Sequence, residues 1–180
     1  MKFIPTNLSK CYLIDAQVSR DQRGSFIKIY NEKCFLENGI STAFKEQFCS
    51  ISNKNVLRGM HYQEPPHDHC KLVSCFSGSV LDVVLDIRKN SVTYGESIAI
   101  ELSADNGLAL FIPIGMAHGF LSLEDNSGMF YSTSTEYAKQ SDSGIHWSSF
   151  GFNWPIKQPI ISQRDGLHPQ LNDINSPFEI

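Results

Sequence analysis

Short segments in which apolar residues recur at every second position constrain the fold of this chain most strongly. In residues 79–87 one face of an extended strand carries Leu81, Val83, Leu85 and Ile87, whereas the other mixes two valines with Asp82 and Asp86. The same alternation returns in residues 98–102 and 110–112. A period of two indicates β-strands, and many short strands separated by turns predict a sandwich or barrel. A mixed inner face in such a small barrel indicates a lumen that holds a ligand.

The segments between these strands are turns, with few helices. Residues 76–79 predict a tight hairpin turn between two strands. Residues 31–39 begin with Asn and end with Gly, which predicts a helix of about two turns, and residues 139–146 could form a second one. We expect one domain over residues 1–180, whose tail from about residue 155 contains four prolines and wraps irregularly over the body.

Composition and charge exclude several classes of protein. With 41% hydrophobic residues among 180, the chain can bury a core, so it is not a disordered polymer. Its net charge of -4 excludes broad binding to a nucleic-acid backbone, although a local basic pocket for one phosphate group is compatible with it.

The cysteines and the apolar stretches indicate the cellular compartment in which the protein works. The number of cysteines is odd, five, without a Cys-x-x-Cys pair, which is atypical of a disulfide-stapled secreted module. The first residues lack the apolar core of a signal peptide, and the most apolar stretch, residues 108–117, is too short to span a bilayer. We therefore expect a reduced, soluble, cytoplasmic protein.

Four of the six histidines could form a metal site. His67 and His69 would point to the same side of a strand, and His61 or His118 could complete a set of nitrogen ligands. However, Glu-Pro-Pro at residues 64–66 favours a loop here, and no spare carboxylate stands at a useful spacing.

A second hypothesis needs no metal. His61 lies between a glycine-bearing turn and a strand, where it could act as a general base if a carboxylate oriented it. Arg58 and Gln63 flank it with groups that bind anions and hydroxyls. The structural alternative is a histidine that satisfies its own hydrogen bonds at a strand end.

Other candidate residues each have a functional and a structural interpretation. Lys71 could neutralise an oxyanion or protect an edge strand. His118, between two glycines, could point into a pocket or belong to a turn. Tyr131 and Tyr137 could donate a proton or pack in the core. Asp165 is a late carboxylate that could equally be a surface charge.

An arginine near the N-terminus has the same two interpretations. Arg23 stands beside Gly24 at a strand entrance, an arrangement that suits a phosphate because the glycine permits close approach. A solvated turn is the alternative.

The order of these motifs resembles the dTDP-4-dehydrorhamnose 3,5-epimerase family, over about residues 10–166. The motifs that carry the resemblance are Asp-x-Arg-Gly-x-Phe at 21–26, Leu-Arg-Gly-Met-His-Tyr-Gln at 57–63, Lys-Leu-Val at 71–73, Ile-Pro-x-Gly-x-Ala-His-Gly-Phe at 112–120, Tyr131 with Tyr137, and Ser-x-x-Asp at 162–165.

The resemblance implies a mostly β, cupin-type jelly-roll barrel with a few short helices. It implies a homodimer that shares strands and an isomerase that works without metal or coenzyme. Such enzymes invert carbons that flank the C4 ketone of a nucleotide-linked 4-keto-6-deoxy sugar, in deoxysugar or surface-polysaccharide biosynthesis.

The resemblance also implies roles for individual residues. His61 would be the base, held by Asp165, while Lys71 stabilises the enolate oxygen and Tyr131 returns a proton from the opposite face. Arg23 and Arg58 would hold the diphosphate. The full set expected to bind substrate is Arg23, Phe26, Lys28, Glu46, Arg58, Gln63, His118, Tyr137 and Ser162.

The chain departs from the family pattern at several positions. Lys28 stands where the family usually has Glu, residues 46–48 replace a Gln-x-Asn, and His69 and Ser74 stand where Gln and Arg are usual. By that pattern most of these positions lie toward the nucleotide end of the pocket or its rim. The resemblance therefore supports the expected reaction class more strongly than it supports dTDP as the nucleotide.

Several alternatives stay open. A CDP- or GDP-linked sugar and inversion at a single carbon are two of them. From other classes of protein, a metal-dependent cupin oxygenase using His61, His67, His69 and His118 and a non-catalytic sugar-binding cupin are rivals.

Overall fold

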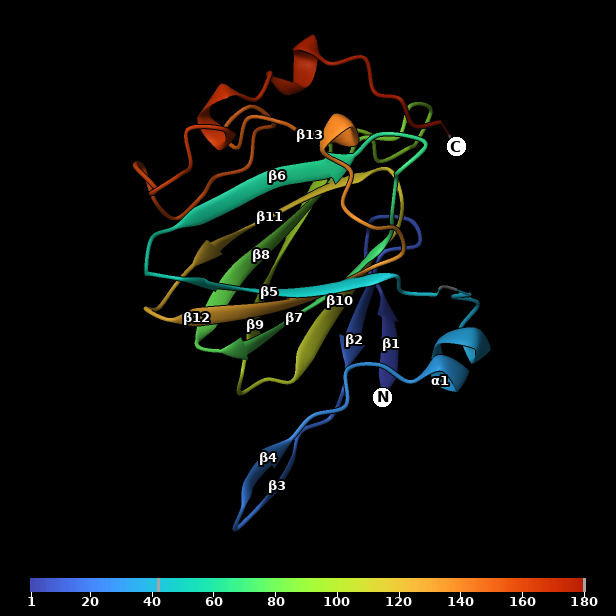
Figure 1. Ribbon diagram of the computed structural model, residues 1–180, viewed down its shortest axis with the longest axis vertical. Helices are drawn as coiled ribbons and strands as arrows, with labels where there is room; N and C mark the ends of the chain where they lie inside the picture. Colours follow the sequence, from blue (N-terminus) through green and yellow to red (C-terminus); the bar gives the residue numbers. More distant parts are fainter. Residues whose placement is uncertain (42, 180) are drawn as a thin grey trace.

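The computed structural model describes residues 1–41 and 43–179 and consists mainly of two antiparallel β-sheets that face each other (Figure 1). Strand order is β1-β2-β10-β7-β12-β5 in the six-stranded sheet and β13-β6-β11-β8-β9 in the five-stranded sheet. This arrangement confirms the mostly β architecture that the alternating apolar residues predict. None of the helices in the described part of the chain is long and apolar enough to cross a bilayer.

The elements have the following bounds. The six-stranded sheet contains β1 (Lys2–Pro5), β2 (Tyr12–Asp15), β5 (Glu46–Ser52), β7 (Lys71–Ser77), β10 (Leu108–Ile112) and β12 (Ser127–Thr133). The five-stranded sheet contains β6 (Leu57–Gln63), β8 (Ser79–Asp86), β9 (Ser97–Ser103), β11 (Met116–Ser122) and β13 (Asp142–Gly144). A separate hairpin consists of β3 (Ser19–Asp21) and β4 (Gly24–Phe26), and the helical segments are α1 (Glu32–Glu37), η1 (Lys139–Ser141), η2 (Asp165–Leu167) and η3 (Leu171–Asp173).

Strand β8 separates two apolar clusters. Val80 and Val84, from its mixed face, pack between the sheets, where Asp82 is also fully buried. Val83 and Leu85, from its apolar face, pack on the other side against aromatic residues of the C-terminal segment. That segment, orange to red in Figure 1, covers the outer face of the five-stranded sheet. The mixed face therefore points into the interior, as its pattern predicts.

The two expected helices have different outcomes. The first is confirmed as α1, which begins after Asn31, whose side chain accepts a hydrogen bond from the Cys34 N–H at 3.1 Å. The prediction of a helix over residues 139–146 is wrong, because only η1 is helical and β13 then pairs with β6. Pairing at this sheet edge satisfies the backbone of a segment with little helical periodicity.

The predicted hairpin at residues 76–79 is also wrong. β7 pairs with β10 and β12, whereas β8 pairs with β9 and β11, so the chain passes from one sheet to the other at Gly78. Gly78 has φ of +64°, which glycine adopts without strain. The chain does change direction here, but local sequence does not determine whether the next strand joins the same sheet.

Gly59 on β6 and Gly119 on β11 allow these two strands to approach unusually closely. A Cβ atom built on Gly119 would lie 2.7 Å from Met60 Sδ and 2.8 Å from the Arg58 carbonyl oxygen. The strand register shifts between His118 and Phe120, next to this contact. The close approach therefore lies beside the paired residues His118 and His61, which face each other across these strands.

We expect Gly119→Ala to lower the free energy of unfolding by about 2 kcal/mol, because the added methyl group overlaps backbone and Met60 atoms. Denaturant unfolding measures the change. Gly166→Ala is the matched control, because its nearest neighbour, Ile161 Cδ1, would lie at an ordinary 3.4 Å. Equal stability of both variants would contradict the close packing.

Candidate active site

A polar cavity of about 300 Å³ lies between the two sheets. Both sheets line it, so its walls carry side chains from strands far apart in the sequence. The lining includes eight of the residues expected from the sequence: Glu46, Arg58, His61, Gln63, Lys71, His118, Tyr131 and Tyr137.

His61, on β6, is oriented by a buried carboxylate. Its Nε2 lies 2.8 Å from Asp165 Oδ1, and the Asp165 side chain is only 3% exposed. The Gly59 N–H donates to Asp165 Oδ2, and the Asp165 N–H donates to Ser162 Oγ. Ser162 therefore supports the loop of Asp165 and is not among the residues that line the cavity.

The surroundings of His61 favour its neutral form. Burial lowers the pKa of His61, Asp165 opposes this effect, and the charges of Arg164 and Lys71 lower the pKa further. Burial would raise the pKa of Asp165, but the hydrogen bond and charge of His61 and the Gly59 N–H hold it below its usual range. A neutral imidazole beside an ionised carboxylate has the composition of a general base.

Lys71 is a buried amine at the start of β7. Its Nζ donates a hydrogen bond to the His61 carbonyl oxygen at 3.0 Å, and the residue is 9% exposed. Burial lowers the pKa of Lys71 to about 8, although the charges of Asp142 and Asp82 raise it. Lys71 is therefore mostly protonated at neutral pH, and a cation in a dry cavity can stabilise a developing oxyanion.

Tyr131 lies on the opposite wall, on β12 of the six-stranded sheet. It is 7% exposed, and its hydroxyl lies 3.4 Å from Ser50 Oγ. Burial raises the pKa of Tyr131, so the phenol keeps its proton. The His118 ring, whose Nε2 lies 2.8 Å from Asp82 Oδ2, and the Tyr131 ring form a T-shaped contact with centroids 6.2 Å apart. The cavity thus has an imidazole on one wall and a phenol on the other.

Three expected substrate-binding residues do not reach the cavity of their own chain. Arg23 and Phe26 belong to the β3–β4 hairpin, which projects away from the body in Figure 1. Arg23 pairs with Asp21, and Phe26 is 64% exposed. Lys28 is an exposed residue just beyond the hairpin.

The cavity also contains charged residues that the sequence analysis missed. Asp142 lies on β13, and the Arg164 guanidinium contacts both Asp142 and Nε2 of His61. Asp142 pairs with Gln63 across the strands, so interpreting residues 139–146 as a strand would have placed it here. For Arg164, the one feature of the sequence that could have indicated a place in the site is its position directly before Asp165.

The histidines of the metal hypothesis do not converge among the described residues. His67 Nδ1 contacts Ser141 Oγ at 3.0 Å, and His69 Nδ1 contacts Thr135 Oγ1 at 3.2 Å.

One group of three potential ligands does occur among the described residues: His61, Asp165 and His168. The charged Arg164 Nη2 lies 2.8 Å from His61 Nε2 and already places a cation there. The metal-dependent alternative is not favoured.

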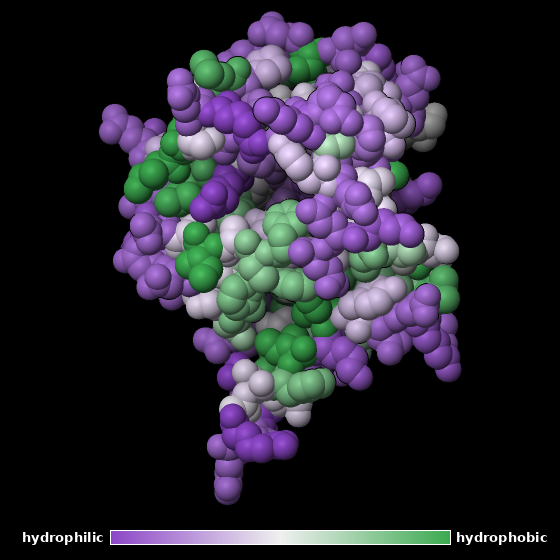
Figure 2. All heavy atoms as spheres, in the orientation of Figure 1, coloured by the Kyte–Doolittle hydropathy of each residue, from purple (hydrophilic) through white to green (hydrophobic). Residues whose placement is uncertain are grey.

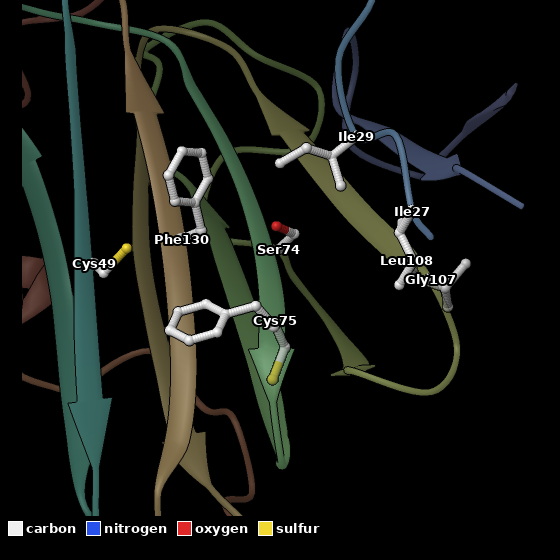
Figure 3. Close-up of a pocket in the computed structure, with 9 residues that line it drawn as sticks. Ile27, Ile29, Cys49, Ser74, Cys75, Gly107, Leu108 and Phe130 are labelled. Atoms are coloured by element: carbon white, nitrogen blue, oxygen red, sulfur yellow. The ribbon is translucent and has the colours of Figure 1, made fainter. Parts of the chain in front are cut away.

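A second hollow, of about 330 Å³, lies on the outer face of the six-stranded sheet and is apolar (Figure 3). Figure 2 shows apolar residues gathered between the hairpin and the body. The hollow is lined by Ile27, Ile29, Cys49, Ser74, Cys75, Phe76, Gly107, Leu108 and Phe130. This set offers no acid–base pair, so the polar cavity is the candidate active site.

Comparisons with known proteins lead to a single family. Residues 5–173 match the family model described as dTDP-4-dehydrorhamnose 3,5-epimerase. The enzyme of that name from Shigella flexneri is 40% identical over 168 residues, which cover 92% of this chain and 93% of the relative.

Two solved structures are also similar. The epimerase of Legionella pneumophila in complex with dTDP-4-keto-L-rhamnose has a TM-score of 0.92 and 34% identity, covering 97% of this chain and 94% of the other. A 3'-monoepimerase from Streptomyces bikiniensis in complex with dTDP-quinovose has a TM-score of 0.88 and 26% identity, covering 93% and 87%.

Opposite charges beside His61 predict opposite effects on its titration. We expect Asp165→Asn to lower the pKa of His61, because it removes the carboxylate that favours the imidazolium. Arg164→Gln should raise the pKa of His61, because it removes a neighbouring positive charge. NMR titration of the His61 ring measures both, and a shift of the same sign in the two variants would contradict the geometry.

Proposed function

The chain belongs to the dTDP-4-dehydrorhamnose 3,5-epimerase family and is an epimerase with a cupin-type fold, and from this premise we propose that it inverts C3 and C5 of a nucleotide-linked 4-keto-6-deoxy sugar. The single observation that carries the proposal is the placement of His61 and Tyr131 on opposite walls of one cavity. Inversion requires that a proton leaves one face of the sugar ring and returns to the other.

The reaction starts at a carbon next to the C4 ketone. Such a C–H bond is weakly acidic, so its cleavage requires a base and a stabilised enolate. Neutral His61 takes the proton, and the electron pair moves to the ketone oxygen, where the ammonium group of Lys71 stabilises it. Tyr131 then gives its O–H proton to the opposite face, which restores the ketone and inverts the carbon.

The relatives support inversion at two carbons. The Shigella enzyme, named for two positions, is 40% identical to this chain, whereas the 3'-monoepimerase is 26% identical. One base and one acid would serve both carbons in turn, since C3 and C5 flank the same ketone. Inversion at one carbon only is the competing outcome of the experiment below.

For the nucleotide we propose dTDP, because the similar Legionella enzyme is in complex with a dTDP-sugar. Arg58 lines the cavity and would bind the diphosphate, with Glu46, Gln63, His118 and Tyr137 around the sugar and nucleotide. A CDP- or GDP-linked substrate is the alternative outcome.

We also propose a homodimer in which the β3–β4 hairpin serves the partner's site. The hairpin projects from the body, and Arg23 and Phe26 lie outside the cavity of their own chain. Its continuation, Ile27 and Ile29, lines the apolar hollow on the outer face of the six-stranded sheet. A second copy packed there would cover this apolar surface and extend the hairpin toward another cavity.

We propose that the enzyme works in the cytoplasm, in deoxysugar or surface-polysaccharide biosynthesis. The odd number of cysteines without a Cys-x-x-Cys pair is consistent with a reducing compartment.

Replacing the base and the acid should have different effects. With dTDP-4-keto-6-deoxyglucose in deuterium oxide, His61→Ala should slow exchange at C3 and C5 by roughly 10²–10⁴-fold, because proton removal fails. Tyr131→Phe should impair inversion more than exchange, because only proton return fails. NMR of the sugar distinguishes the two, with circular dichroism to confirm folding.

Unaltered turnover in either variant would contradict the assigned roles. Exchange at a single carbon in the wild type would reduce the proposal to a monoepimerase. Faster exchange with the CDP- or GDP-linked sugar would overturn the dTDP assignment.

Mixing two inactive variants tests whether the site is shared. If Arg23 serves the partner's cavity, a mixed dimer of His61→Ala and Arg23→Ala contains one site with both residues intact. After unfolding and refolding together, activity should return to about one quarter of the wild type, because half of the dimers are mixed and one site in two is intact.

Each variant refolded alone is the control. A monomeric mass in solution, or no recovery on mixing, would contradict the shared site.

A further inference from the structure

Edge strand β5 holds the proposed acid, Tyr131, through two side chains. Phe48 is the direct cross-strand partner of Tyr131, and their rings stack with centroids 4.6 Å apart and planes inclined by 13°. Ser50, two residues further and so on the same face of the strand, lies 3.4 Å from the Tyr131 hydroxyl. One strand therefore contacts both the ring plane and the hydroxyl.

The position of β5 makes the stacked ring important. β5 is the last strand of the six-stranded sheet, so no further strand covers this side of Tyr131. Phe48 is 45% exposed, whereas Tyr131 is only 7% exposed. The outer ring thus shields the inner one, and both line the polar cavity.

We propose that Phe48 is a positioning residue that holds the Tyr131 phenol toward the reacting carbon and keeps water away from it. This inference rests on the proposed epimerase function. No role was expected for Phe48 from the sequence, so only the stacking contact and its exposure indicate one.

Stereochemistry explains why such a contact matters. Once His61 has taken the proton, the enolate is planar, and the face that receives the next proton decides the product. Proton return from Tyr131 breaks its O–H bond, forms the new C–H bond from the enolate electron pair and restores the ketone. After the product leaves and solvent enters the cavity, the phenolate takes up a proton and the His61 imidazolium releases the one that it took. A misplaced phenol leaves the enolate to regain a proton on its original face, which gives exchange without inversion.

The charges around Tyr131 come from several strands, and Phe48 adds none. Burial raises the pKa of Tyr131 most. Among its neighbours Ser50 and Arg58 lower this pKa, Asp82 and Cys75 raise it, and the His118 ring lies with its centroid 6.2 Å away. Replacing Phe48 therefore changes the access of water and the support of the ring without removing a charge.

Three substitutions at position 48 separate these effects. Phe48→Asn should lower the pKa of Tyr131 toward that of a solvated tyrosine and decrease the ratio of inversion to deuterium exchange by roughly tenfold or more. Phe48→Leu, apolar without a ring, should have an intermediate ratio. Phe48→Tyr, which keeps a stacked ring, should retain the wild-type ratio.

The readouts are NMR of the sugar in deuterium oxide and ultraviolet titration of the phenol. Each titration is compared with the same variant carrying Tyr131→Phe, so that the Tyr131 signal is isolated. Leu36→Ala, which removes an exposed apolar side chain on α1, is the control and should change neither readout.

An unchanged pKa of Tyr131 together with an unchanged ratio in Phe48→Asn would overturn the proposal. An equal loss of exchange and inversion would also overturn it, because Phe48 would then support the whole cavity. Failure of the proposed epimerase function can be distinguished from failure of this inference. In the first case the wild type would show no deuterium exchange, whereas the titration of Tyr131 tests the stacking contact without substrate.

Discussion

Burial of three titratable side chains in one β-sandwich cavity is the constraint on which the rest of the structure depends. Removing a charged group from water costs free energy, so burial favours the neutral form of each group. It lowers the pKa of His61, lowers the pKa of Lys71 to about 8 and raises the pKa of Tyr131. The same physical effect therefore favours a neutral imidazole at His61 and a phenol at Tyr131 that keeps its proton. It also brings the pKa of Lys71 close to neutral pH.

Desolvation is tolerated because each group has a partner supplied by the fold. Asp165 accepts from His61, and the His61 carbonyl oxygen accepts from Lys71. Because the base belongs to the five-stranded sheet and the phenol to the six-stranded sheet, the separation of the layers places them on opposite walls. Inversion of a carbon between the walls follows from this geometry, whereas a site built on one sheet would return the proton to the face that lost it.

The sequence predicted the local features well and the long-range pairings poorly. The mixed face of β8 and the helix after Asn31 follow from patterns within a few residues. The path at Gly78 and the strand at residues 142–144 depend on which distant strand pairs next, which no local pattern encodes. Asp142, on that strand, was missed for the same reason. The contact of Arg164 with His61 and the position of the β3–β4 hairpin relative to the cavity both depend on tertiary structure.

The most direct test of the central claim is a crystal structure of the enzyme with an unreactive nucleotide-linked 6-deoxy sugar. The account predicts that the sugar ring lies between the His61 imidazole and the Tyr131 hydroxyl, one on each face, with the C4 substituent directed to Lys71 Nζ. A sugar bound outside the cavity, or contacted by both groups on the same face, would contradict it.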